Sequence, residues 1–548
     1  MRRLHGRWGK GLTCAALALG AASCGADGGD DGALREQRRP FASDQATLVV
    51  MSFDAELVAP STSGASNNPT KYVKEQLFYT VGQLNAHASV GQLDRVAISN
   101  VQVSANGDGQ SRVRYHASLP VGWGDGAPPA SFELVLPRRV SAAGLSSFAA
   151  AYASTCVEAP GEHAVTAGNY WYHYRPQAPG CSLAPEHAVR SAATVTIGEG
   201  NTSGELPELH HVWADNTLRV VAVFGKYQDG ATDPADPGIE AYDTFLERLP
   251  AELGVPLSTT PGEVPHHPGT SLPDVTFDGR TDDGRAVQVT ALLIDSPKAA
   301  GASFDARYAA LTREADLVVY DGHAGLGANV HALAQKGSFL PGRWQLFFIN
   351  GCDTFAYLDD ELAKRRAVHN PDDPSGTKYM DVLTNLMPSY FASMPSASIA
   401  VVRGLIGPPR SYQEIFADID PEQVVVVTGE EDNVFDPSWP PPWPGLSASG
   451  ALARGAADRF ETPVLSPGRY LFELRPEPQT NGGDADLYVG LGFEPTTATY
   501  SFAPYLVGSN ETVDVTLDEP TRIQLMVHGY EGSVAPTSKY RLRGSVTQ

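Results

Sequence analysis

The sequence is short of positive charge and of long apolar runs. Its 548 residues hold 40 Lys and Arg against 63 Asp and Glu, which gives a formal net charge of −23. Nucleic-acid phosphates repel so acidic a chain, so we expect no nucleic-acid partner. No stretch reaches the ~18 apolar residues that a membrane-spanning helix needs. Any membrane attachment is therefore expected to come from an anchor and not from a span.

Cysteine is also scarce, and the five cysteines fall into different roles by position. Cys14 lies in an N-terminal leader and Cys24 directly follows that leader. Cys156 and Cys181 are the only nearby pair, and in an exported chain they predict a disulfide. Cys352 is left over, which indicates either a reactive thiol or a buried structural cysteine.

The first 23 residues are typical of a bacterial export signal. Four basic residues precede an apolar run over 12–22, and small residues end at Ser23. Small residues followed by cysteine resemble a lipobox, which implies lipidation of Cys24, and residues 24–44 then form a flexible tether. We therefore expect an exported lipoprotein of the outer membrane, periplasm or cell surface that touches the membrane only through Cys24. An ordinary secretory signal is the alternative.

The length predicts about three domains after the tether. The pattern over 45–205 predicts an α+β domain. It contains no catalytic motif, so we interpret it as a prodomain or a substrate-recognition domain. The elements expected there are strands over 46–53, 95–103, 111–119 and 132–136, a helix starting at Asn68-Pro69, and a helix over 141–154.

Residues 215–433 alternate strand and helix, which predicts an α/β domain with a mostly parallel sheet covered on both faces. The expected strands cover 218–224, 287–294, 317–320, 344–349, 399–402 and 424–427. The expected helices start at Asp236-Pro237 and near Ser303, and cover 378–387 and 412–416.

Two apolar runs in this domain end in small-residue turns, one presenting His323 and the other Cys352. In open α/β sheets, chemistry gathers at the carboxyl ends of the strands. A thiol needs a base beside it, because the thiolate is the nucleophile. The pattern predicts a Cys352–His323 dyad. A helix-like run over 355–364 would favour the thiolate, and Asp353 would oppose it.

This order of histidine and cysteine resembles the caspase/gingipain-type cysteine peptidases. The resemblance implies a cysteine endopeptidase that forms a thioester acyl-enzyme on peptide or protein substrates and requires no cofactor. It also implies an oxyanion site at two backbone N–H groups, that of Cys352 and the one after the histidine, within the turn Gly322, Ala324 and Gly325. The family usually has glycine where Ala324 stands. A catalytically inactive surface protein used for binding or adhesion, and a transpeptidase or acyltransferase, are the alternatives.

Further polar residues are candidates for binding. Asp353 and the loop acids Glu430, Glu431 and Asp432 could receive a basic substrate side chain, and the loop acids could also bind calcium or be solvated. The adjacent pairs His210-His211 and His266-His267 lack the spacing of zinc ligands, which argues against a zinc site.

A Pro/Trp-rich linker over 434–455 precedes regular short strands over 456–548, which predict a β-sandwich. Gly-Asp-Ala-Asp-Leu-Tyr at 483–488, Pro504-Tyr505 and Val527-His-Gly-Tyr530 resemble the bacterial pre-peptidase C-terminal domain. Asp484 and Asp486 alternate along a strand and share a face, so they are candidate calcium ligands or a surface carboxylate pair.

Overall fold

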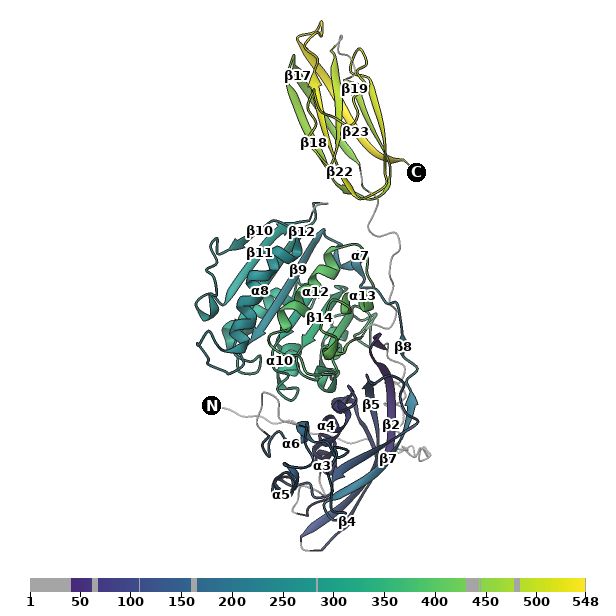
Figure 1. The fold of residues 1–548 in the computed structure, drawn as a ribbon, viewed down its shortest axis with the longest axis vertical. Helices are drawn as coiled ribbons and strands as arrows, with labels where there is room; N and C mark the ends of the chain where they lie inside the picture. Colours follow the sequence, from purple (N-terminus) through teal and green to yellow (C-terminus); the bar gives the residue numbers. More distant parts are fainter. Residues whose placement is uncertain are drawn as a thin grey trace, which may run out of the picture.

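The computed structural model describes residues 41–61, 68–107, 109–158, 165–281, 284–429, 443, 445–477 and 483–547. The described strands form a ten-stranded sheet, a six-stranded sheet and two smaller sheets of four and three strands (Figure 1). This multi-sheet arrangement with helices confirms the multidomain α and β architecture in outline. No helix in these ranges is long and apolar enough to cross a membrane.

The ten-stranded sheet has a parallel centre flanked by antiparallel strands, and the pair β1–β8 at one edge is again parallel. Its five central strands, β12, β9, β13, β14 and β15, run parallel to one another, and β11 and β16 flank them antiparallel. The strands in spatial order are β10 (Leu257–Thr260), β11 (Asp274–Arg280), β12 (Ala286–Ile294), β9 (Thr217–Gly225), β13 (Leu317–Asp321), β14 (Gln345–Asn350), β15 (Met380–Asn385), β16 (Val425–Thr428), β1 (Phe41–Ala42) and β8 (Asn201–Thr202).

Helices cover both faces of this sheet, as the alternation of strands and helices predicts. One face packs on α7 (Leu209–Val212), α8 (Pro237–Leu253), α12 (Met394–Ile406) and α13 (Tyr412–Phe416) (Figure 1). The other face packs on α9 (Ala302–Thr312), α10 (Ala328–Lys336), the 3₁₀ turn η3 (Thr354–Tyr357) and α11 (Glu361–Ala367). Val319 and Tyr320, successive residues of β13, point into these two different cores, so both faces of the sheet are buried.

Two predicted elements of this domain are wrong, and a third has a different start. The expected helix over 378–387 is strand β15, and the expected strand over 399–402 lies inside helix α12. Helix α9 begins after Gly301, so Ser303 is not its cap. All six residues of β15 are buried, and α12 is buried on most of its surface. Neither segment therefore shows the one-sided pattern from which an element can be recognised.

Residues 45–205, the first unit, contain a six-stranded sheet and helices. Its sheet has the order β3 (Val90–Gly91), β5 (Gln110–Trp123), β2 (Thr47–Pro60), β7 (Ala188–Ile197) and β6 (Ser131–Pro137), with β4 (Ala97–Ala105) paired to β5. Its helices are α3 (Pro69–Leu77), α4 (Tyr79–Asn85), α5 (Ala142–Tyr152) and α6 (Tyr170–His173). The Asn68 and Ser141 side chains cap α3 and α5, which confirms both predicted helix starts.

The first unit and the α/β domain share one apolar core. A single cluster of buried residues runs from Leu57 and Leu119 of the first unit to Val318 and Phe347 of the large sheet. Strands β1 and β8, at the two ends of the first unit, also extend the edge of the large sheet beyond β16. At the predicted boundary between 205 and 215 the arrangement of strands changes, but the apolar core continues across it.

A disulfide joins Cys156 to Cys181 in the first unit, as predicted. The bridge closes a loop with a sequence separation of 25 residues. In the chain-entropy model, such a loop stabilises the fold by about 3 kcal/mol. We expect the double variant Cys156→Ala/Cys181→Ala to lose about that much free energy of unfolding in urea. Cys352→Ala, which leaves the bridge intact, is the control. Equal stability of the oxidised protein and the double variant would contradict the expectation.

The C-terminal strands form two packed sheets. One has the order β17 (Leu446–Ala453), β23 (Thr537–Thr547), β19 (Gly468–Pro476) and β21 (Glu511–Leu517), and the other has β18 (Ala457–Leu465), β22 (Thr521–Gly529) and β20 (Ala485–Leu491). Residues of both sheets share a separate apolar cluster. Strand β17 lies inside the stretch predicted as linker, and Trp443 packs on Tyr470 and Phe472. The sandwich therefore begins earlier than the sequence indicates.

Candidate functional site

The turns that carry His323 and Cys352 meet at the carboxyl edge of the large sheet. Strands β13 and β14 are adjacent and parallel, with Asp321 paired to Asn350. Past this pair, the Gly322 amide donates to the Asn350 carbonyl at 3.2 Å. A Cβ added at Gly351 would lie 2.5 Å from the Gly322 carbonyl oxygen. The two turns therefore approach so closely that glycine is required at 351.

The His323 residue is held by its backbone and by aromatic neighbours. Its carbonyl accepts hydrogen bonds from the Tyr320 hydroxyl at 2.9 Å and from Asn329 Nδ2 at 2.7 Å. Its half-buried ring lies 4.9 Å from the Tyr227 ring and 5.0 Å from the Phe391 ring, measured between centroids. These contacts limit the ring's movement without enclosing it.

Cys352 is a half-buried thiol that takes part in no disulfide. Its Sγ donates a weak hydrogen bond to the Ser389 carbonyl at 3.5 Å. Ser389 belongs to the loop between β15 and α12, which also supplies Phe391 to the His323 ring. This loop therefore contacts both predicted dyad residues. The sequence does not indicate this loop, because the strand that leads into it is predicted as a helix.

Beneath Cys352 lies a buried network of amide and hydroxyl groups. The Asn350 Oδ1 atom accepts from Asn385 Nδ2 at 2.9 Å, from the Ser389 hydroxyl at 2.7 Å and from Gln423 Nε2 at 2.9 Å. Asn350 Nδ2 in turn donates to Asp321 Oδ1 at 2.6 Å, and the Ser398 hydroxyl also donates to that carboxyl. The network fixes the end of β14 and the loop that contacts Cys352.

Asp321, at the foot of this network, is in an unusual electrostatic state. Complete burial raises its pKa to about 8, against the opposing hydrogen bonds from Ser398 and Asn350. The group is therefore mostly protonated at neutral pH. A neutral carboxyl below the edge avoids placing a fixed negative charge beneath the thiol.

Asp353 is not open to a substrate, which corrects its predicted binding role. Its side chain is buried, and the residue is 1% exposed. Its backbone is in the left-handed region, with a φ of 51°. Asn85 Nδ2 donates to its Oδ1 at 2.6 Å. Burial raises its pKa to about 7, although the hydrogen bonds of Asn85 and Tyr172 and the charge of Arg175 lower it. The first unit therefore reaches the residue next to Cys352.

The expected helix after Cys352 also differs from the structure. The short 3₁₀ turn η3 follows Asp353, and α11 begins only at Glu361. The predicted stabilisation of a thiolate by an adjacent α-helix N-terminus is therefore wrong. At the other turn, Gly325 adopts a left-handed φ of 61°. Ala324, the residue after His323, is 5% exposed and belongs to the apolar core.

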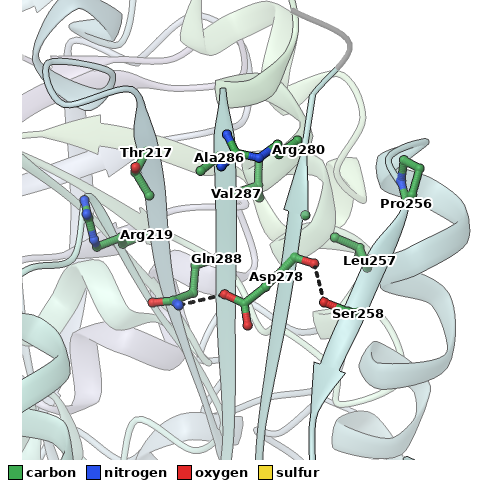
Figure 2. A pocket seen from close by; sticks show the side chains of 11 residues that line it. Thr217, Arg219, Pro256, Leu257, Ser258, Asp278, Arg280, Ala286, Val287 and Gln288 are labelled. Carbon is green, nitrogen blue, oxygen red and sulfur yellow. Dashed lines mark hydrogen bonds between the residues drawn. The ribbon is translucent and has the colours of Figure 1, made fainter. Parts of the chain in front are cut away.

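The opposite edge of the sheet holds a groove of about 730 Å³ (Figure 2). It lies at the amino ends of β9 and β12, near Thr217 and Ala286. Figure 2 shows the Gln288 amide donating to the Asp278 carboxylate, a 2.8 Å bond. The residues that line it include no cysteine and no histidine, so the groove offers no counterpart to the predicted dyad.

Several predicted residues lie elsewhere. Cys24 and the loop acids Glu430, Glu431 and Asp432 fall outside the described residues. In the sandwich, the pKa of Asp486 rises to about 6 through burial and the nearby charge of Asp484. Glu511, which is not among the predicted calcium ligands, is buried beside them and accepts the Leu487 and Leu506 amides. Calcium binding by the two aspartates stays a prediction.

No protein-family model matches the chain, and no curated protein matches it. Among solved structures, a pre-peptidase C-terminal domain of collagenase from Bacillus anthracis is 16% identical, covering 18% of this chain and 89% of that one at a TM-score of 0.15. PliG of Aeromonas hydrophila, a periplasmic inhibitor of g-type lysozyme, is 14% identical, covering 19% of this chain and 86% of that one at a TM-score of 0.16.

A two-domain esterase active on acetylated mannans is 10% identical, covering 63% of this chain and 98% of that one at a TM-score of 0.15. The collagenase domain is of the kind that residues 456–548 resemble. Likenesses at these identities and scores carry no argument about activity, so the function rests on the site's own residues.

Proposed function

We propose that the protein is an exported cysteine endopeptidase of the caspase/gingipain type, anchored in the membrane by a lipid on Cys24. The close meeting of the two glycine-containing turns at the ends of β13 and β14 is the observation that supports this most. It brings a thiol and an imidazole to one edge of a buried parallel sheet, where α/β enzymes carry their chemistry.

In this proposal, His323 removes the proton from the Cys352 thiol, and the thiolate attacks the carbonyl carbon of the scissile peptide bond. The tetrahedral intermediate collapses when His323 returns the proton to the leaving amine, which breaks the C–N bond and leaves a thioester. Water, deprotonated by His323, then attacks the thioester. The acid product leaves, and the proton restores the thiol.

The electrostatics around the thiol support this role. Asp353 is adjacent to Cys352, and a full negative charge there would oppose thiolate formation. Because burial raises the pKa of Asp353 to about 7, this charge is only partly present near neutral pH. The pKa of the deeper Asp321 is raised to about 8, so Asp321 adds little negative charge.

The surface around His323 favours an apolar or aromatic substrate side chain. Tyr227 and Phe391 contact the His323 ring, and Tyr227 is 36% exposed. Tyr390, which precedes Phe391 in the chain, is 50% exposed. Solvent-exposed aromatic rings beside a reactive centre bind a substrate best when its side chain covers their apolar faces. A basic side chain bound by Glu430, Glu431 and Asp432 remains the competing prediction from the sequence.

An inactive surface protein that binds or adheres is the second candidate. Its support is Ala324, which departs from the family's glycine at the turn where an oxyanion would be bound. Against it, the Ala324 methyl group belongs to the core. At 5% exposure, this methyl group takes up little of the surface that a substrate would contact.

A peptide library and an activity probe test the proposal together. A peptidyl probe with a thiol-reactive group should label Cys352. The peptide library should be cleaved, with a preference for peptides that have an apolar residue next to the scissile bond. Product analysis with an added amine distinguishes hydrolysis from acyl transfer. Peptides that bind but are neither cleaved nor trapped by the probe would favour the inactive binding protein.

The C-terminal sandwich is expected to be dispensable for turnover. It has an apolar cluster of its own, separate from the two that cover the large sheet. A chain that ends before Leu446 should therefore cleave a small peptide at close to the full-length rate, within about twofold. Circular dichroism serves as the control for folding. A folded truncated chain that has lost turnover would show that the sandwich takes part in catalysis.

A further inference from the structure

The loop over 261–268 places two histidines against helix α8. The loop follows β10 and carries His266 and His267 between Pro265 and Pro268. Asp243 and Glu247 lie one turn apart on α8, so their side chains share a face of the helix. The spacing of this histidine pair in the sequence does not predict a zinc site. The two acids are brought to the pair only by the packing of the loop on the helix.

The donor atoms of Glu247, His266 and His267 lie together, all within 4.8 Å of one another. His266 Nε2 is 3.6 Å from Glu247 Oε1. A hydrogen bond between these atoms would be about 2.7–3.2 Å long. Ligands bound to one tetrahedral Zn²⁺ at about 2.1 Å stand about 3.4 Å apart. The observed spacing is nearer to that of two ligands sharing a cation than to that of a direct hydrogen bond.

Asp243 stands behind His267 as a buried carboxylate. Its side chain is 1% exposed, and its Oδ2 lies 3.7 Å from His267 Nδ1. The Gly269 amide donates to its other oxygen at 2.8 Å. Metal-binding histidines commonly turn their second ring nitrogen toward such a carboxylate, which orients the ring. The 3.7 Å separation is that of an ion pair and is longer than a hydrogen bond, so Asp243 faces His267 as a charged partner from the side on which an orienting carboxylate lies.

The backbone of the loop is constrained beside α8, while the side chains of His266 and Glu247 are exposed, 70% and 59%. His267 adopts a left-handed φ of 50°, which is costly for a residue with a side chain. The Tyr242 hydroxyl donates to the Leu272 carbonyl at 2.7 Å and ties the chain after the loop to α8. A cavity of about 360 Å³ opens here, lined by the four polar residues and by apolar neighbours such as Val264 and Phe277.

We propose that Glu247, His266 and His267 bind one Zn²⁺, with Asp243 as the residue that positions His267. Two imidazoles and a carboxylate suit zinc, whereas calcium and magnesium prefer oxygen ligands alone. The two carboxylates also carry the negative charge that balances a divalent cation. The ion joins the loop over 261–268 to α8, on the face of the sheet that packs α8. It stabilises this segment independently of the chemistry proposed for Cys352.

Zinc titration of the full-length chain tests this site, with Cys352→Ala as the background because a thiol also binds zinc. The protein is freed of metal with a chelator and titrated with Zn²⁺ in competition with a chromophoric chelator. The background protein should bind one equivalent that is lost in Glu247→Gln and in His266→Ala. Asp243→Asn, which keeps the acceptor for Gly269, should weaken that equivalent about 10-fold.

Two further measurements distinguish zinc at this site from zinc bound elsewhere on the chain. The variant His210→Ala/His211→Ala should bind zinc like the background, although Glu208, His210 and His211 also lie close together. Zinc should slow proteolysis within 261–268 in the background protein and not in His266→Ala, whose exposed side chain makes folding of the variant secure. The proposal is overturned if no equivalent binds, if Glu247→Gln and His266→Ala both retain it, or if it is lost only in the His210/His211 variant.

Discussion

Replacing Cys352 by alanine is expected to abolish peptide hydrolysis and to leave the fold intact. The thiol is half-buried, and the hydrogen bond that it donates to the Ser389 carbonyl, at 3.5 Å, is weak. Losing a sulfur in this position should change the free energy of unfolding by less than about 1 kcal/mol. Hydrolysis should fall at least about 10³-fold, because the described residues include no second cysteine outside a disulfide.

Two variants test the proposed base, His323→Phe and His323→Ala. Phenylalanine keeps a ring against Tyr227 and Phe391, so its loss of activity reports on proton transfer and not on packing. Both variants should lose nearly as much activity as Cys352→Ala. The double variant with Cys352→Ala should be little worse than either single one, because residues that act as one unit are strongly non-additive.

These variants are assayed for hydrolysis of a small peptide and for thermal unfolding. A folded Cys352→Ala protein with full activity would defeat the proposed mechanism. A His323→Phe protein that retains full activity would leave the thiol without its proposed base. Activity lost together with the cooperative unfolding transition would mean that Cys352 serves the fold, as a buried structural cysteine does.

Much of the framework around the dyad can be predicted from local sequence. The runs that end at Asp321 and Asn350 are entirely buried, and each is followed by small residues, so two neighbouring strand ends could be placed. The helix starts at Asn68 and Ser141 follow from capping side chains that bond within three residues. In each case the cause lies within a few residues of the pattern.

The predictions fail where burial removes the periodic signal. β15 is buried along its whole length, and the Ile399–Val402 run of α12 is fully or almost fully buried. For such segments, β-branched residues favour a strand, but packing decides the structure. Because the sequence predicts a helix where β15 lies, it gives no sign of the loop that contacts both Cys352 and His323.

The remaining partners of the site are distant in the sequence. Asn85 lies 268 residues before Asp353, and their contact depends on how the first unit packs on the sheet. The same holds for Glu247 and His266, which come together only through the return of the loop to α8. The sequence alone shows which residues have reactive side chains. It shows few of the contacts between distant residues that determine their environment.

The Asp353→Asn variant is expected to reverse a pH-dependent loss of stability. Burial raises the pKa of this carboxyl to about 7 in the folded protein, from an ordinary value of 3.8. Between these values the folded state holds a proton that the unfolded state has released. Stability therefore falls as pH rises from about 4 to about 7 and stays low above that range. A difference of about 3 pKa units corresponds to about 4 kcal/mol as an upper bound.

Asparagine cannot ionise, and its Oδ1 still accepts the hydrogen bond from Asn85. Asp353→Asn should therefore match the wild type near pH 4 and exceed it by a few kcal/mol near pH 8, measured by urea unfolding of the α/β core. Part of the downward slope should remain, because burial also raises the pKa of Asp321 to about 8 and that of Asp316 to about 7. Asp44→Asn, at an exposed position, is the matched control and should leave the profile unchanged. If Asp353→Asn shows the same pH profile as the wild type, Asp353 is ionised in the folded protein, and its charge then opposes the thiolate at Cys352 at neutral pH.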